Sequence, residues 1–259
     1  MTPTLQDLQD LARGAGEILR AGFHNANHIQ HKGAIDLVTE IDHQSERYLL
    51  EQISTRFPSH HIVAEETGQK QGDPDHTWYI DPLDGTTNFA HRLPIFSVSI
   101  AYAHQNQVTL GVVYDPIRDE LFSADLGQGA ALNGTPIRPT AQSELSRSLV
   151  VTGFPYDRFT NPENNLDHMR RFTLRVQGIR RLGSAALDLC YIASGRVDGY
   201  WEIKLEAWDL AAGALIAREA GALVSKIDGQ PDLLTPPYSI VAANPALHPA
   251  MLEVLQLKD

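Results

Sequence analysis

The sequence predicts an α+β or α/β protein built from alternating layers of helix and sheet. Its 259 residues are enough to bury a large core. Short apolar runs of strand length stand close together in the first half, and helical patterns alternate with strand patterns in the second. A hydrophobic fraction of 42% and a charged fraction of 20% are typical of a globular protein. Disorder is therefore excluded as the main state of the chain.

The first half opens with helices and continues as strands. Leucines and alanines from Leu5 to Leu19 recur at helical spacing, and Thr2 followed by Pro3 predicts an N-cap and a first turn. A second helix is expected from about Asp42 to Phe57, closed by Pro58. Because the last four of the strands that follow are separated only by turn residues, they predict an antiparallel meander. The expected strands are His61–Ala64, Trp78–Ile80, Phe96–Tyr102, Val108–Tyr114, Glu120–Ala124 and Ala130–Leu132.

The second half alternates helices with strands. The expected helices are Asn164–Arg175, Ser184–Ala193, Trp208–Ala220 and Ala246–Leu257. The expected strands are Leu149–Thr152, Gly199–Ile203, Ala222–Ile227 and Ile240–Ala243. The polar stretch Pro139–Ser148 predicts a boundary between two halves of the chain. We therefore expect one domain over residues 1–259 with two packed halves, about 1–145 and about 146–259.

The charge balance and the cysteine count narrow the class of protein. Lys and Arg total 21 against 32 for Asp and Glu, a formal charge of −11, so neither direct nucleic-acid binding nor a membrane surface is expected as a partner. Cys190 is the only cysteine, which excludes an intrachain disulfide and favours a cytoplasmic location. Asp7, Asp10 and Glu17 interrupt the first apolar pattern, which is atypical of a signal or transit peptide.

The most informative segment runs from Trp78 to Asn88, where an apolar strand leads into two carboxylates and then a Gly-Thr-Thr helix start. Asp81 and Asp84, three residues apart across a proline turn, would repel each other unless a cation lay between them, and hard oxygen ligands suit Mg²⁺. The backbone N–H groups of residues 85–87 would face the same place and could bind a phosphate. The alternative is ordinary Asp-Pro and Asp-Gly turn chemistry.

Three further acidic segments accompany this one. The strand ending at Ala64 is followed by Glu65 and Glu66, a second anionic cluster. Asp209 stands at the start of a helix with many small residues and is either an N-cap or a metal ligand. The segment Asp36–Asp42 opens the second helix and has the same two interpretations.

Taken together, these segments resemble the inositol monophosphatases, Mg²⁺-dependent and lithium-sensitive phosphatases of small phosphorylated polyols. The order and spacing of the motifs carry the resemblance, and two further stretches are most similar to the bacterial branch. The resemblance implies a five-layer α-β-α-β-α sandwich of the inositol monophosphatase and fructose bisphosphatase type, a homodimer, and two or three Mg²⁺ per active site. The motifs are DLVTEID (36–42), AEET (64–67), WYIDPLDGTTNF (78–89) and WDLAAG (208–213), and the bacterial stretches are TGFPYD (152–157) and GSAALDL (183–189).

The resemblance also implies roles for individual residues. The metal ligands would be Glu65, Asp81, Asp84, Asp209 and the backbone carbonyl of Leu83. Glu65 is preferred to Glu66 because the family's ligand is the first acid of the pair. Asp42 and Thr86 match the pair that positions the attacking water, and with Glu65 they form the catalytic group. The substrate-binding positions would be Asp84, Gly85, Thr86, Gly183, Ser184, Ala185, Glu202 and Asp209.

The activity that the resemblance implies is hydrolysis of inositol monophosphate to myo-inositol and phosphate by direct attack of a metal-activated water, without a phosphoenzyme. The enzymatic alternatives act on fructose 1,6-bisphosphate, 3'-phosphoadenosine nucleotides or histidinol phosphate. Thr87 and Asn88 favour inositol phosphate, with a sugar bisphosphate next. A regulator of the same fold, acting through protein partners in RNA metabolism, is the alternative from another class. The loop from Ile203 to Ala207 departs from the bacterial pattern of a Gly, a basic residue and a Pro, so substrate preference stays open.

Some patterns have simpler interpretations. His24, His28 and His31 have near-helical spacing but no acidic neighbours, so we expect surface groups and no metal site. The segment Asp115–Asp119 predicts a hairpin turn. Cys190 lies in an apolar helical pattern and is expected in the core.

Overall fold

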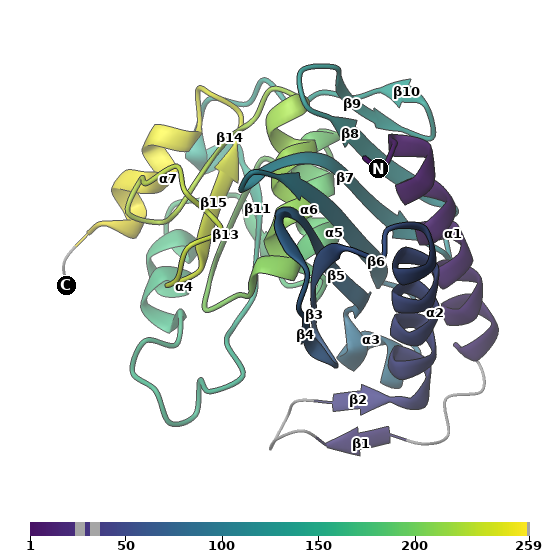
Figure 1. The fold of residues 1–259 in the computed structure, drawn as a ribbon. Coiled ribbons are helices and arrows are strands. Elements are labelled where there is room, and N and C mark those ends of the chain that lie inside the picture. The colour runs from purple at the N-terminus through teal and green to yellow at the C-terminus, as the bar shows by residue number, and fades with distance from the viewer. Residues whose placement is uncertain (24–28, 32–36, 258–259) are drawn as a thin grey trace.

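Three layers of helices and two layers of sheet alternate through the part of the chain that the structure describes, residues 1–23, 29–31 and 37–257. In this computed structural model the layers follow the order α-β-α-β-α (Figure 1), which confirms the expected five-layer α+β fold. The α-helices are α1 (Leu5–Gly22), α2 (Glu40–Arg56), α3 (Thr86–Ala90), α4 (Leu166–Thr173), α5 (Ala185–Ala193), α6 (Ala207–Glu219) and α7 (His248–Leu255).

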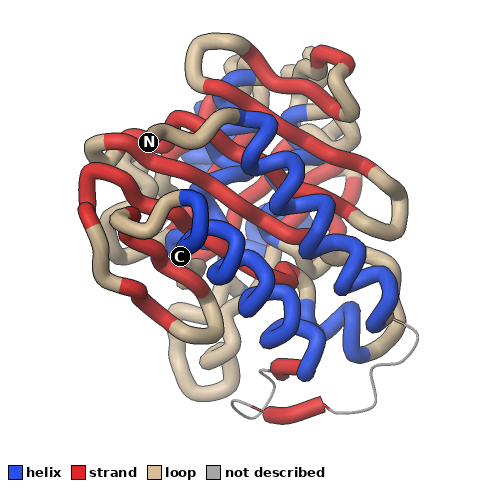
Figure 2. Tube along the Cα trace, turned by 45° about the vertical axis from the view of Figure 1, so that its right-hand side comes forward, coloured by secondary structure: helices blue, strands red, loops and turns tan. Residues whose placement is uncertain are grey.

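Helices α1 and α2 lie side by side over one face of the larger sheet (Figure 2). Thr4 caps α1: the backbone N–H of Asp7 donates to its hydroxyl at 3.3 Å, and the N–H of Thr4 donates to the Asp7 carboxylate at 2.9 Å. The expected N-cap at Thr2 is wrong, because this reciprocal box needs an acceptor three residues later and Leu5 has none. Helix α2 begins before Asp42, since Thr39 makes the same box with that residue.

The larger sheet has eight strands. They are β3 (His60–Ala64), β4 (Gly68–Lys70), β5 (Asp73–Asp84), β6 (Ser97–His104), β7 (Gln107–Asp115), β8 (Glu120–Asp125), β9 (Gly129–Leu132) and β10 (Thr135–Pro136). Their order is β10-β9-β8-β7-β6-β5-β3-β4. Neighbours from β5 to β10 are antiparallel, which confirms the meander, whereas β3 runs parallel to β5. The carboxyl ends of β3 and β5 therefore meet at one edge.

The smaller sheet has five strands in the order β12-β11-β13-β15-β14. They are β11 (Leu149–Thr152), β12 (Gly178–Arg180), β13 (Gly199–Ile203), β14 (Leu223–Ser225) and β15 (Ser239–Ala243). The chain passes from one sheet to the other through residues 137–148, which include the short 3₁₀ helix Leu145–Arg147. A separate two-stranded sheet pairs β1 (Ile29–His31) with β2 (Leu37–Thr39). The short strands β1, β2, β4, β10 and β12 were not predicted, because two or three residues carry no alternation pattern.

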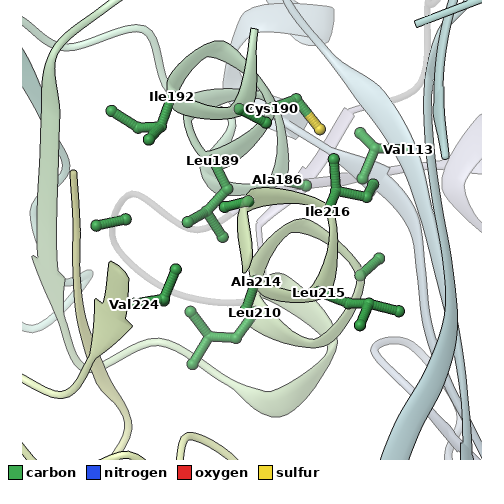
Figure 3. Packing of buried hydrophobic residues seen from close by; sticks show 14 of the residues in the cluster. Val113, Ala186, Leu189, Cys190, Ile192, Leu210, Ala214, Leu215, Ile216 and Val224 are labelled. Carbon is green, nitrogen blue, oxygen red and sulfur yellow. The ribbon is translucent and has the colours of Figure 1, made fainter. Parts of the chain in front are cut away.

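Helices α5 and α6 fill the space between the two sheets (Figure 3). Gly213 makes their close approach possible, because a Cβ there would lie 2.8 Å from the Cβ of Leu189. Cys190 is fully buried in this cluster, which confirms its core position. A second apolar cluster lies under α1 and α2, and a third lies between the smaller sheet and the outer helices α4 and α7.

The remaining sequence predictions have mixed outcomes. The hairpin between β7 and β8 is confirmed: the Asp115 carboxylate accepts from the N–H of Ile117 at 2.9 Å and of Arg118 at 3.0 Å. His24 and His28 lie outside the described residues, as does the side chain of His31. Within the described ranges, none of the helices combines the length and the apolar character that crossing a membrane requires.

Candidate active site

The candidate site lies where β3 and β5 end. Because the two strands are parallel, Glu65 follows β3 beside the end of β5, and its N–H donates to the carbonyl of Ile80 at 3.2 Å. Asp81 and Asp84 occupy the last positions of β5, where one extra residue opposes β6 as a bulge. The sequence prediction that charge gathers at this strand end agrees with these positions.

Gly85 makes the turn from β5 into α3 and brings the two halves of the chain together. Its φ of +103° is a left-handed conformation that favours glycine. A Cβ here would lie 3.0 Å from the carbonyl oxygen of Ile95 and 3.1 Å from that of Gly183. Any larger side chain would push the β5–α3 turn away from the segment that leads into α5. The close approach therefore depends on this glycine.

Asp84 reaches across to the N-terminus of α5. Its carboxylate accepts from the hydroxyl of Ser184 at 2.6 Å and from the N–H groups of Ala185 at 3.2 Å and Ala186 at 2.8 Å. Burial raises the pKa of Asp84, and these hydrogen bonds oppose that rise. The contact brings two predicted substrate-binding residues, Ser184 and Ala185, to one metal-ligand candidate.

Asp42, Thr86 and Leu83 form a second contact group below the turn. The Thr86 hydroxyl lies 3.1 Å from the Asp42 carboxylate and 3.1 Å from the carbonyl oxygen of Leu83, so its single proton can serve either acceptor. Burial raises the pKa of Asp42 to about 6, against the hydrogen bonds from Thr39. The predicted pairing of Asp42 with Thr86 is thus present as a contact.

Charge repulsion between the remaining acidic residues affects their pKa values. Burial raises the pKa of Asp81 well above its usual value, and Glu65, Asp84 and Asp209 add to the rise by repulsion. Burial likewise raises the pKa of Asp209, with Asp84 the next cause. Asp209 is not the N-cap of α6: Glu206 holds that position and donates its N–H to the Asp209 carboxylate at 2.7 Å. Without a cation, these carboxylates destabilise one another.

A cavity of about 100 Å³ opens beside this cluster. Of the predicted site residues, it is lined by Asp84, Gly85, Gly183, Ser184, Ala185, Glu202 and Asp209. Glu65, Asp81, Leu83, Thr86 and Asp42 do not line it. Asp84 links the residues that line the cavity to those that do not, because its carboxylate accepts from the N-terminus of α5 and its charge raises the pKa of Asp81.

Glu202 is one of the residues that line the cavity. It accepts from the Tyr200 hydroxyl at 2.7 Å, and burial raises its pKa to about 7. The unusual loop that follows places Lys204 at the rim, where its ammonium group lies 2.9 Å from the Asp157 carboxylate. Lys204 also lines a larger hollow of about 520 Å³ between α4 and β15, which holds none of the predicted site residues.

The donor set suits a hard cation, although within the described ranges no three His, Cys, Asp or Glu side chains are already arranged around a metal position. Asp81, Asp84 and Asp209 instead accept from backbone N–H groups. Four repelling carboxylates and a buried carbonyl are the oxygen ligands that Mg²⁺ prefers. The residues fit this ion if their carboxylates turn from those N–H groups.

Sequence reasoning missed a polar stripe on α2. Ser45 donates to the carbonyl of Pro82 at 2.9 Å, and Glu46 accepts from the N–H groups of Glu66 and Thr67 at 2.8 and 2.9 Å. With Asp42, these buried residues stand at helical spacing on the face where apolar residues were expected. Polar residues at core spacing were the available signal. They hold both acidic turns in place.

Asp188 and Arg181 were also missed, although both line the cavity. Asp188 is the only charged residue within the apolar helix α5. An acid in such a helix is rarely buried unless it is paired.

The fold and the site define a layered α+β protein with an acidic cluster between its halves, of the kind found in phosphatases. The profile of the inositol monophosphatase family matches residues 1–258, and the chain belongs to that family. The chain is 48% identical over 244 residues to an inositol-1-monophosphatase of Synechocystis, covering 93% of this chain and 84% of the relative. It is 43% identical to the Nus factor SuhB of Pasteurella multocida, covering 99% and 97%. The crystal structure of an extragenic suppressor protein suhB from Bartonella henselae superposes with a TM-score of 0.92 at 36% identity, covering 98% of each chain.

Proposed function

We propose that the protein hydrolyses inositol monophosphate to myo-inositol and phosphate in a Mg²⁺-dependent reaction. The observation that carries the proposal is the group of acids at the ends of β3 and β5 and the start of α6, where burial and the repulsion of neighbouring acids raise the pKa values of Asp81 and Asp209. Such a cluster is stable in its ionised form only with positive charge between its members. The family and the name of the Synechocystis relative support the same reaction.

In the proposed mechanism, Glu65, Asp81, Asp84, Asp209 and the Leu83 carbonyl hold the metal. When bound, Mg²⁺ would supply the charge that activates a water and offsets charge on the leaving oxygen. Thr86 orients that water through its hydroxyl, which Asp42 holds at 3.1 Å. The N–H groups of the β5–α3 turn bind the phosphate, and Glu202 and residues 183–185 contact the hydroxyls of the polyol. The water attacks phosphorus directly, and no residue is phosphorylated.

The test is phosphate release from inositol 1-phosphate, fructose 1,6-bisphosphate and 3'-phosphoadenosine 5'-phosphate, each with Mg²⁺, with EDTA and with added Li⁺. We expect hydrolysis of the inositol ester above the others, lost with EDTA and inhibited by Li⁺. Preference for fructose 1,6-bisphosphate would favour the runner-up substrate. Trapping of a phosphorylated residue would exclude direct attack by water.

A second candidate function rests on the Nus factor names. Relatives that carry this name are 42% or 43% identical over almost the whole chain. Regulation through protein partners in RNA metabolism is therefore the alternative. Under this alternative we still predict that the protein does not bind nucleic acid directly. Asp209→Asn separates the two, because it removes a proposed metal ligand: a phosphatase loses its biological activity and a regulator keeps it.

The proposed function also needs both halves of the chain. Residues 1–145 supply the phosphate-binding turn and most of the acids, and residues 146–259 supply Asp209 and the polyol contacts. We propose that they work as one domain, in a cytoplasmic homodimer.

A further inference from the structure

One buried acceptor in the candidate site has no hydrogen-bond partner. Oδ1 of Asp188 is the single buried side-chain nitrogen or oxygen left without a partner within residues 1–23, 29–31 and 37–257. The residue is 1% exposed. Leaving a buried acceptor unsatisfied costs stability, so such atoms in folded proteins call for an explanation, and a bound ligand is one.

The position of Asp188 in its helix explains why an acid is tolerated there but not why it is buried. Asp188 lies in the first turn of α5, where the helix dipole favours an acid. That attraction would act equally on an exposed carboxylate, and it does not require burial. Every other residue of α5 except Tyr191 is also buried, and Leu189 and Cys190 pack into the apolar cluster between the sheets. A leucine or alanine would suit packing alone.

The surroundings of Asp188 point toward the cavity. The residue lines the same 100 Å³ space as Glu202, Ser184 and Asp84. Ser184 and Asp84 already bind each other at 2.6 Å, and Glu202 accepts from Tyr200. Arg181 also lines this space and its charge lowers the pKa of Asp188 against the rise that burial causes, but it makes no hydrogen bond to Oδ1. A ligand that satisfies it must therefore bring its own O–H or N–H group.

We infer that Asp188 is a further substrate-binding residue, whose free oxygen accepts a hydrogen bond from a hydroxyl of the bound polyol. The inference rests on the proposed function for the reaction and adds the recognition of the alcohol part of the substrate. An anion without a proton has no hydrogen to donate to this oxygen, and Glu202 and Asp84 repel negative charge there. A neutral polyhydroxyl group offers donors without adding negative charge.

The test compares Asp188→Ala with the conservative Asp188→Asn and with Cys190→Ala, a matched change on the apolar side of the same helix. Each variant is assayed with inositol 1-phosphate and with p-nitrophenyl phosphate, an ester without polyol hydroxyls. We expect Asp188→Ala to raise KM for inositol 1-phosphate about tenfold or more, with kcat and the aryl ester much less affected. Asp188→Asn should restore most of the affinity, because its amide oxygen is an equivalent acceptor.

A thermal-shift measurement with free myo-inositol gives a readout that does not require turnover. Myo-inositol should raise Tm of the wild type, of Asp188→Asn and of Cys190→Ala, but not of Asp188→Ala. Equal Tm shifts in wild type and Asp188→Ala, or an equal rise in KM for both esters in Asp188→Ala, would overturn the inference. Hydrolysis by the wild type would still uphold the proposed function. If the wild type hydrolysed neither ester, the proposed function would fail and the inference would be decided by the Tm shifts alone. A shift that is lost only in Asp188→Ala would support the inference. The absence of a shift in the wild type would overturn it.

Discussion

Replacing Asp42 by Asn should remove a pH dependence of stability that this carboxyl creates. Burial raises the pKa of Asp42 from 3.8 to about 6 in the folded protein. Between these two values the unfolded chain releases its proton and the folded chain keeps it. Asp42 therefore favours the folded state least at high pH, and stability falls as pH rises through this window.

The magnitude follows from the two pKa values. A rise in the pKa from 3.8 to about 6 corresponds to about 3 kcal/mol once the folded group is fully ionised. Roughly 1 kcal/mol of this effect is already present at about pH 4.5, so the change between pH 4.5 and pH 8 is about 2 kcal/mol. The hydrogen bonds from Thr39 are available to both Asp and Asn, so they contribute an offset that is nearly independent of pH.

The assay is urea unfolding of wild type and Asp42→Asn in EDTA at both pH values. The free energy of unfolding of the variant, relative to wild type, should rise by about 2 kcal/mol from the lower pH to the higher. Glu51→Gln, on the exposed side of α2, is the control and should show no such change. A constant difference between wild type and Asp42→Asn at all pH values would refute the assignment of the raised pKa to Asp42.

Three further changes test other parts of the structure. Thr86→Ala should lower kcat for inositol 1-phosphate about a hundredfold with little change in KM, because it removes the hydroxyl proposed to orient water; steady-state kinetics measures both. Gly213→Ala should lower the free energy of unfolding by about 1–3 kcal/mol, measured in urea, since its methyl group would meet Leu189 at 2.8 Å. His60 accepts from the Trp78 indole at 3.0 Å, and burial lowers its pKa, so stability is complete above about pH 6.5 and falls below it. His60→Gln should flatten that fall in thermal unfolding at several pH values.

Each of these three predictions has a control variant or an outcome that would contradict it. Thr86→Ser keeps the hydroxyl and should keep most of kcat, and a pure rise in KM for Thr86→Ala would contradict the orienting role. Gly221→Ala carries the same methyl into open space and should not clash, although its positive φ adds backbone strain. Equal steepness below pH 6.5 in wild type and His60→Gln would show that another group titrates.

The candidate metal ligands could be named from the sequence because they stand in short motifs that resemble those of the inositol monophosphatases. Asp81 and Asp84 are three residues apart, and their neighbourhood is a local property of the β5–α3 turn. The cap of α1 was predicted two residues too early and the start of α2 two residues too late, since Thr4 and Thr39 are selected as caps by reciprocal hydrogen bonds that the spacing of apolar residues does not report.

Contacts between distant segments could not be read in the same way. Asp84 and Ala186 are 102 positions apart, and only the packing of α5 between the two sheets brings them to 2.8 Å. The polar stripe of α2 and the unpartnered oxygen of Asp188 were also missed, because burial of a polar residue depends on what the fold lays over it. The motifs along the chain thus determine the acidic segments and the family of this protein, and the resemblance to that family implies the layers. Tertiary structure alone decides which acids share a cavity and which of their oxygens have a partner, because desolvation and hydrogen bonding depend on distances through space.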